Sequence, residues 1–119
     1  MSNVIEEKSF EFAVKIVKMA IELKKSNHHY ELASQVLRSG TSVGANVAEA
    51  QCAQSRRDFI SKLHIALKEA NETEYWLRLL TEAEIILPEK SKPLITEVKE
   101  LQRILTAIIN TTNSAVNNC

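Results

Sequence analysis

Three histidines and two cysteines are the side chains best suited to holding a metal ion or attacking a substrate. His28 and His29 are neighbours in a polar stretch, and His64 stands alone in a helical pattern. Two histidines four residues apart on a helix would converge on one metal ion, whereas adjacent histidines do not. Cys52 and Cys119 show neither metal-ligand spacing nor the pattern of a disulfide framework. We therefore predict no metal, no cofactor and two free thiols.

The run from Gly40 to Gly44 is a second place to look for chemistry, because glycine-rich loops bind phosphate groups. It lacks the lysine that follows the last glycine of such a loop, and the strand that precedes one. No recognisable Ser/His/Asp or Cys/His motif marks a nucleophile and its base. We therefore expect no enzymatic activity and identify no small-molecule substrate.

Basic side chains offer a third kind of chemistry, the binding of phosphate groups in nucleic acids. Fifteen basic residues balance fifteen acidic ones, so the net charge is zero. The chain lacks the overall positive charge of a dedicated nucleic-acid-binding protein, and such a role must rest on a local patch. The alternative is a solvated face, because Asp58, Glu69 and Glu82 lie among the basic residues. The candidate contacts to nucleic acid are Arg56, Arg57, Lys62, Lys68 and Arg78.

The elements that position these residues are predicted to be helices. The chain of 119 residues contains only two glycines and two prolines, a composition that favours helix, and its length suits one domain. The first residues do not resemble a secretory signal, and no segment approaches the roughly 18 apolar residues of a membrane span, so we expect a cytoplasmic protein with no membrane partner.

Helix breakers and caps divide the chain into four helical segments. Ser55 and Asp58 have the spacing of a capping box, Ser91 is a candidate N-cap, and Pro93 suits the first turn of a helix. We predict one all-α domain over residues 1–119, folded as an antiparallel up-down four-helix bundle. Its helices are expected over about residues 4–26, 30–53, 56–86 and 93–112, with a frayed tail over 113–119.

The first predicted helix carries two apolar rows on nearly opposite faces. One row contains Phe10, Val14, Val17 and Ile21, and the other contains Phe12, Ile16, Met19 and Leu23. One row can fill the bundle core, so the other favours burial against a second subunit, although a deeply embedded helix is an alternative. On the third helix, aromatic side chains face away from the main apolar stripe. We predict a homo-oligomer with Phe12, Ile16, Met19, Leu23, Tyr75, Trp76 and Leu79 at its interface.

The second and third helices carry small and polar residues with helical spacing. Gly40, Gly44 and Ala48 recur every four residues, which predicts close approach of a neighbouring helix. Glu74 lies within the apolar stripe of the third helix, so it either needs a partner, with Arg38 or Asn46 as candidates, or extends from the edge of the stripe to solvent. Short polar side chains on the other side of the second helix favour a buried polar seam over a solvent-facing row. We assign that polar seam to Arg38, Ser42, Asn46, Glu49, Glu72 and Glu74.

Several of these motifs together resemble a known family. They are Leu32-Ala-Ser-Gln-Val-Leu-Arg38, Ser42-Val-x-x-Asn46-x-Ala48-Glu49, Phe59-x-x-x-Leu63-x-Ile65-Ala66, and Glu72-x-Glu74 with Leu77. This combination is similar to the bacterial 23S rRNA intervening-sequence proteins over nearly the whole chain. The resemblance implies a four-helix bundle, assembly as a homopentameric ring, no established catalytic activity, and an architecture similar to the accessory protein of diversity-generating retroelements.

Two functional hypotheses follow. The first is a homo-oligomeric accessory protein that binds RNA, or associates with an enzyme acting on nucleic acid, through the basic residues named above. The second is an oligomeric scaffold that binds another protein and has no nucleic-acid role.

Overall fold

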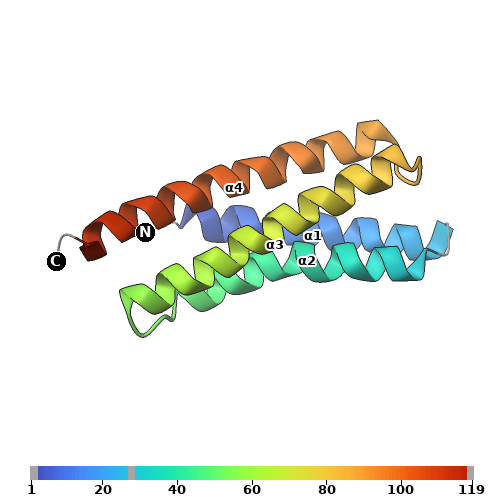
Figure 1. Ribbon diagram of the computed structural model, residues 1–119. Helices are drawn as coiled ribbons and strands as arrows, with labels where there is room; N and C mark the ends of the chain where they lie inside the picture. The colour runs from blue at the N-terminus through green and yellow to red at the C-terminus, as the bar shows by residue number, and fades with distance from the viewer. Residues whose placement is uncertain (1–2, 27–28, 118–119) are drawn as a thin grey trace.

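The computed structural model describes residues 3–26 and 29–117, and all regular structure within those ranges is helical. Figure 1 shows the helices running antiparallel along one long axis. Each helix packs against the next one along the chain, and α4 also packs against α1, so α1 and α3 are diagonal to each other. The predicted all-α up-down bundle is therefore confirmed. The helices are α1 (Val4–Ser26), α2 (Tyr30–Ala50), α3 (Arg56–Glu82) and α4 (Pro88–Asn117).

Local signals in the sequence account for the starts of the first and third helices. The Asn3 side chain accepts a hydrogen bond from the Glu6 backbone N–H at 3.3 Å, which caps α1. Ser55 caps α3 by accepting from the Asp58 N–H at 3.0 Å. The Asp58 carboxylate in turn accepts from the Gln54 N–H at 3.3 Å. The predicted capping arrangement at Ser55 is confirmed, with the return bond made one residue earlier than in a standard capping box.

The last helix is longer at both ends than its prolines and asparagines suggest. It begins at Pro88, so Pro93 lies inside the helix and Ser91 is not its N-cap. Ser91 is instead buried, and its hydroxyl pairs with that of Thr81 at 2.7 Å. This contact fixes the first turn of α4 on α3. Pro93 has no backbone N–H to donate, and it lies on the exposed side of the helix. The helix then continues through residues 113–117, where the frayed tail was predicted; residues 118–119 lie outside the described ranges.

The second and third helices end earlier than predicted, α2 at Ala50 and α3 at Glu82. After α3, the N–H of Ile85 bonds to the carbonyl of Leu80 at 2.9 Å, and the N–H of Glu84 bonds to that of Thr81 at 3.0 Å. This is a Schellman ending, with Glu84 at the left-handed position and a φ of 62°. The reversal turns Ile85 and Ile86 back onto the core.

Glycine at position 84 should stabilise the protein, because a left-handed φ strains any residue with a side-chain Cβ. We expect Glu84→Gly to raise the free energy of unfolding by about 0.5–1 kcal/mol, less than the full strain because glycine also gains freedom in the unfolded chain. Urea unfolding followed by circular dichroism measures the change. Glu82→Gly is the contrasting variant: it places glycine in the last turn of the helix and should destabilise, and equal effects of both variants would refute the explanation.

The first two helices approach each other closely at the predicted glycines. A Cβ at Gly40 would lie 2.7 Å from Cγ2 of Ile16, and one at Gly44 would lie 3.2 Å from the carbonyl oxygen of Ser9. Both glycines therefore face α1, and the prediction that they permit close approach of a neighbouring helix is confirmed for these two positions. Ala48, by contrast, is exposed.

Ion pairs join α1 to α4 along their common edge. The Lys8 ammonium lies 2.8 Å from the Glu100 carboxylate, and Lys15 lies 2.7 Å from Glu97. The hydrogen bond between Lys8 and Glu100 raises the pKa of Lys8 and lowers that of Glu100, as expected when each charge stabilises the other. These four charges are therefore directed toward the neighbouring helix.

Candidate functional site

A network of polar contacts connects α2 to α3 at Arg38. Its guanidinium pairs with Glu69 at 3.1 Å and forms a second ion pair with Glu72. Glu72 also accepts a hydrogen bond of 3.0 Å from the indole Nε1 of Trp76. The pairing fixes the Trp76 ring at the margin of the core, where it is partly buried. Arg38 and Glu72 are therefore in direct contact, as expected for two members of the predicted polar seam.

The other residues assigned to the polar seam do not join this network. The Ser42 hydroxyl donates to the Arg38 carbonyl at 2.6 Å, and the Asn46 amide donates to the Ser42 carbonyl at 2.8 Å, so both bond within their own helix. Glu49 lies 3.6 Å from Lys62 and is exposed. A continuous buried polar seam along α2 was therefore a wrong prediction, because short polar side chains can satisfy themselves on the preceding turn.

Glu74 lies on the opposite side of α3 from Arg38. It accepts a hydrogen bond of 2.8 Å from the Gln102 amide on α4, and its side chain is only 18% exposed. Neither Arg38 nor Asn46 is its partner, so that expectation was wrong. The partner could not be identified from spacing alone because Gln102 lies 28 residues further along the chain.

Sequence reasoning also missed a buried pair of hydroxyl groups at the centre of the α2–α3 contact. The Thr73 hydroxyl donates to that of Ser39 at 3.0 Å, and both residues are fully buried. Such a pair satisfies two polar groups that would otherwise be costly to bury. The available signal was the position of Thr73 beside the apolar stripe of its helix.

The two apolar rows of α1 are placed the other way round from the prediction. Phe12, Ile16 and Leu23 are buried in the core of their own chain, and Met19 packs against that core, so these four residues are not available to a second subunit. The opposite row is exposed, with Phe10 at 69% and Ile21 at 51%. We call this exposed row the α1 row; it consists of Phe10, Val14, Val17 and Ile21. On α3, Tyr75 and Leu79 are exposed as predicted, whereas Trp76 is partly buried.

A line of exposed residues runs along the outward side of α3, diagonal to α1. Its members recur at alternating spacings of four and three residues, which places them on one side of the helix. Four of them are basic or histidine, and Glu82 at the end is the one acidic member. We call this line the α3 stripe; it consists of Arg57, Ser61, His64, Lys68, Asn71, Tyr75, Arg78 and Glu82.

Three of the five predicted nucleic-acid contacts, Arg57, Lys68 and Arg78, lie on the α3 stripe. Arg78 also lies 3.9 Å from Glu74 but remains 70% exposed. Lys62 is turned toward Glu49 on α2. Arg56 is exposed at the first turn of α3, next to the stripe rather than on it. The structure therefore brings three predicted basic residues together with His64, which sequence reasoning had considered only as a metal ligand.

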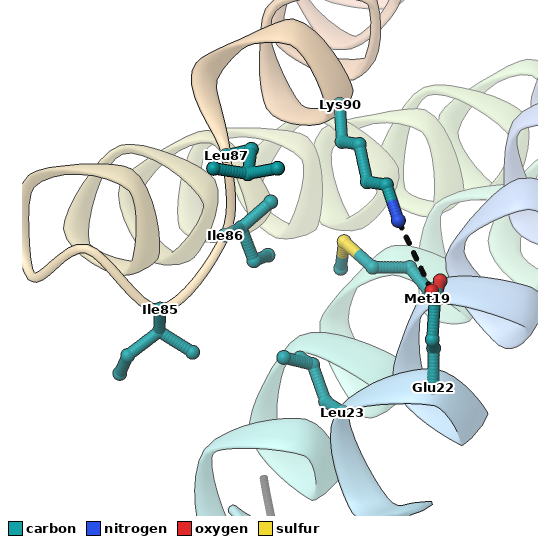
Figure 2. A pocket seen from close by; sticks show the side chains of 7 residues that line it. All are labelled: Met19, Glu22, Leu23, Ile85, Ile86, Leu87 and Lys90. Carbon is teal, nitrogen blue, oxygen red and sulfur yellow. Dashed lines mark hydrogen bonds and ion pairs between the residues drawn. The ribbon is translucent and has the colours of Figure 1, made fainter. Parts of the chain in front are cut away.

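An apolar cavity of about 210 Å³ lies at the end of the bundle where α3 turns into α4. Figure 2 shows Met19 and Leu23 of α1 opposite Ile85, Ile86 and Leu87 of the connection. An ion pair of 3.0 Å between Lys90 and Glu22 spans the cavity beside Met19. The two charged lining residues, Glu22 and Lys90, pair with each other and the other five are apolar, so we assign the cavity no chemistry.

The described residues show no group of three or more His, Cys, Asp or Glu side chains placed to hold a metal ion. Cys52 is a free, exposed thiol. His28 and Cys119 lie outside the described ranges. Among the described helices, none is long and apolar enough to cross a membrane.

Comparison with known proteins agrees with this architecture. No curated protein matches the chain. A solved structure from Bacteroides thetaiotaomicron, of a protein with unknown function from the S23 ribosomal protein family, is 50% identical, with a TM-score of 0.87. The match covers 88% of this chain and 97% of that one. The family model for the 23S rRNA-intervening sequence protein matches residues 1–107. A match over this much of a chain with the same four-helix architecture means that the protein belongs to the 23S rRNA-intervening sequence protein family.

Proposed function

We propose that this protein is a non-enzymatic, homo-oligomeric accessory protein that binds RNA through the α3 stripe. The observation that carries the proposal is the composition of the stripe, in which Arg57, His64, Lys68 and Arg78 share one exposed side of a helix. Arginine and lysine bind phosphate groups, and a line of them along a helix can follow a nucleic-acid backbone.

The acidic residues of α3 support this proposal because of where they point. Glu69 and Glu72 are paired with Arg38 on α2, and Glu74 accepts from Gln102 on α4. Asp58 accepts from the backbone N–H of Gln54 at the start of the helix. Asp58, Glu69 and Glu72 are therefore held at the sides of α3, while Glu74 reaches both Gln102 and, at 3.9 Å, Arg78 of the stripe. The helix has mixed charge in sequence, yet its exposed stripe carries three basic residues and His64 against one acidic residue, Glu82.

An aromatic residue and a surface hollow also favour RNA as the partner. Tyr75 lies on the α3 stripe between Lys68 and Arg78 and is 60% exposed. It borders a surface hollow of about 510 Å³ that Asn71, Arg78 and Leu79 also line, together with the carboxylates of Glu74 and Glu82. Exposed aromatic rings next to basic side chains can stack on unpaired bases of single-stranded RNA. A hairpin loop, which presents unpaired bases beside a charged stem, suits this combination.

Self-association would strengthen binding by a stripe that holds few charges. A chain with zero net charge gains little from long-range attraction to RNA. Several copies bound to one RNA act at high effective concentration, so their modest individual affinities combine. The ring of five copies that the family resemblance implies would present the α3 stripe five times.

A charge-reversal experiment tests the proposed RNA contact. We expect the double variant Arg57→Glu/Lys68→Glu to weaken binding of a 23S rRNA intervening-sequence hairpin by about 100-fold or more at about 50 mM salt, because it replaces two phosphate contacts by repulsion. The matched control is Lys92→Glu/Arg103→Glu, which makes the same change of net charge at exposed positions of α4. Fluorescence anisotropy with a labelled hairpin measures both affinities.

Two results of this experiment would reject the RNA proposal. One is equal loss of affinity in the α3 and α4 variants, which would indicate a response to net charge alone. The other is no binding of the hairpin by the unmodified chain at low salt. The second result would favour the scaffold hypothesis, for which the exposed Ile65 and Leu79 beside the stripe supply apolar surface for another protein.

A further inference from the structure

The surface hollow beside Tyr75 combines an aromatic ring, an arginine and two carboxylates. Carboxylates repel phosphate groups, so their presence on a surface proposed to bind RNA needs an explanation. Bases carry N–H donors that phosphates lack, and a carboxylate accepts hydrogen bonds from such donors. The residues that line the hollow are Asn71, Glu74, Tyr75, Arg78, Leu79 and Glu82.

The Glu74 carboxylate is held in place and keeps the capacity to accept further hydrogen bonds. Its Oε1 atom accepts from the Gln102 amide at 2.8 Å. Its Oε2 atom lies 3.9 Å from the Arg78 guanidinium and 4.0 Å from the Lys99 ammonium, and both distances exceed the length of a hydrogen bond. A carboxylate has about four acceptor positions, so Gln102 leaves most of them to a ligand in the hollow.

The charges around the hollow are close to balance. The carboxylates of Glu74 and Glu82 line it, and the cations of Arg78 and Lys99 lie beside Glu74. A strongly cationic or anionic ligand would meet attraction and repulsion together. A neutral ligand with both donors and acceptors, such as a nucleobase, suits this balance better.

The Tyr75 ring is supported by a neighbour in its own helix. It meets the ring of Trp76 edge to face, with 5.4 Å between the ring centroids and 72° between the ring planes. Trp76 is fixed in turn by the hydrogen bond from its indole Nε1 to Glu72. Tyr75 is nevertheless 60% exposed, so a base can stack on it, and a ring already held in place loses little freedom when a ligand binds.

We infer that this hollow binds an unpaired guanine of the RNA. The inference rests on the proposed function and names the base that the same surface selects. Guanine has two neighbouring donors, N1–H and N2–H, and two neighbouring acceptors, O6 and N7. Glu74 accepts from the two donors, Arg78 donates to the two acceptors, and Tyr75 stacks on the face of the base. Adenine, cytosine and uracil have no such pair of neighbouring donors.

The α3 stripe then has two parts with different tasks. Arg57 and Lys68 precede the hollow along the helix and contact phosphate groups, whereas Arg78 lies at the hollow itself. Phosphate contacts position a nucleic acid, and base contacts supply the specificity. Because contacts to a base release no counterions, the preference for guanine should not depend on salt, although the overall affinity does.

Hairpins that differ at one loop base test the inference on the unmodified chain. Each probe has the same stem closed by a loop of uridines, in which one central position is guanosine, adenosine, cytidine or uridine. We expect the guanosine loop to bind about tenfold more tightly than the other three at every salt concentration. Fluorescence anisotropy measures the affinities.

Two analogues of guanosine test the two edges of the base separately. Inosine lacks the N2 amino group that donates to Glu74, and 7-deazaguanosine lacks the N7 acceptor for Arg78. Each should reduce the preference over uridine to about threefold or less. These measurements need no substitution in the protein, so they stand whether or not a variant folds.

Glu74→Gln tests the role of the carboxylate in the protein. The ratio of the affinities for the guanosine and uridine loops should fall from about ten to near one. The ratio cancels the general gain in affinity that follows when any negative charge is removed. Glu89→Gln is the matched control, since it makes the same change at an exposed position of α4 outside the hollow, and it should keep the ratio. Circular dichroism verifies that both variants fold.

Three results would overturn the inference: equal affinity for the four loops, the full preference retained by inosine and by Glu74→Gln, or dissociation of the assembly by Tyr75→Ala in sedimentation velocity. The last result would place Tyr75 between subunits, as predicted from the sequence, and close the hollow to RNA. Equal affinities with a steep salt dependence reject the guanine site alone and leave the phosphate contacts of Arg57 and Lys68 standing. No binding of any hairpin at low salt rejects the guanine site and the proposed function together.

Discussion

Replacing Phe12 by alanine is expected to lower the free energy of unfolding by about 3–5 kcal/mol. Phe12 is fully buried in the core of its own chain, so truncation removes apolar contacts and leaves a cavity. Phe10 is the matched control because it is the same residue type, two positions away on the same helix, and 69% exposed. We expect Phe10→Ala to change the free energy of unfolding of the monomer by less than about 0.5 kcal/mol.

Urea unfolding at several protein concentrations distinguishes a core position of Phe12 from the subunit-interface position that was predicted from the sequence. Loss of a core side chain lowers stability equally at every concentration, whereas loss of an interface contact weakens the concentration dependence. The expected pattern is a large, concentration-independent loss for Phe12→Ala. A small loss for Phe12→Ala together with a large one for Phe10→Ala would contradict the placement of the two rows of α1.

Substitution of Gly40 by alanine is expected to destabilise the bundle although alanine favours helix. The added Cβ would lie 2.7 Å from Cγ2 and 3.2 Å from Cβ of Ile16, and this Cβ-branched side chain in the core has little freedom to move aside. Overpacking of this kind costs about 1–3 kcal/mol, which outweighs the roughly 1 kcal/mol that alanine contributes to a helix interior. A net loss of about 1 kcal/mol or more is expected in urea unfolding.

Gly44→Ala is the control for this substitution. Its Cβ would lie 3.2 Å from the Ser9 carbonyl oxygen, a milder overlap than the 2.7 Å contact with Ile16 at position 40. We expect the strain and the helix preference to balance, leaving stability within about 0.5 kcal/mol of the unmodified chain. Stabilisation by Gly40→Ala would show that Ile16 can yield, and that glycine is not needed for the close approach of α1 and α2.

Helix number and order could be predicted from sequence because they depend on local signals. Ser55 has the right residue type and spacing for a cap, and the structure uses it as one. The start of α4 was harder to predict, since Pro88 and Pro93 both suit a first turn. The contact of Ser91 with Thr81 on another helix favours the start at Pro88. Local helix propensity gives no information about that contact.

Which row of α1 faces inward could not be predicted for a similar reason. Both rows contain a phenylalanine and three aliphatic or methionine side chains at helical spacing. The row containing Ile16 is buried because Gly40 on α2 receives Ile16 at close range. The sequence contained the glycine and the isoleucine, yet only the packing of α1 on α2 connects them.

The residues of the candidate RNA site could likewise be predicted from the sequence, whereas the charge of its surface depends on tertiary contacts. Its basic residues could be listed from the sequence, but the acidic residues among them left the charge of the surface open. The pairing of Glu69 and Glu72 with Arg38, and of Glu74 with Gln102, determines which charges remain on the outward side of α3. Those partners lie on other helices, so the α3 stripe emerges only from the folded bundle.

The salt dependence of RNA binding tests the proposal of an RNA contact through the α3 stripe most directly. Each phosphate contact contributes about 0.7–0.9 to the slope of log affinity against log salt concentration. We predict a steep negative slope for the unmodified chain on the hairpin RNA. In Arg57→Glu/Lys68→Glu, the slope should become shallower by the contribution of about two phosphate contacts for each bound subunit. In Lys92→Glu/Arg103→Glu, the slope should stay unchanged. A slope near zero for the unmodified chain, or the same slope in both double variants, would contradict the account.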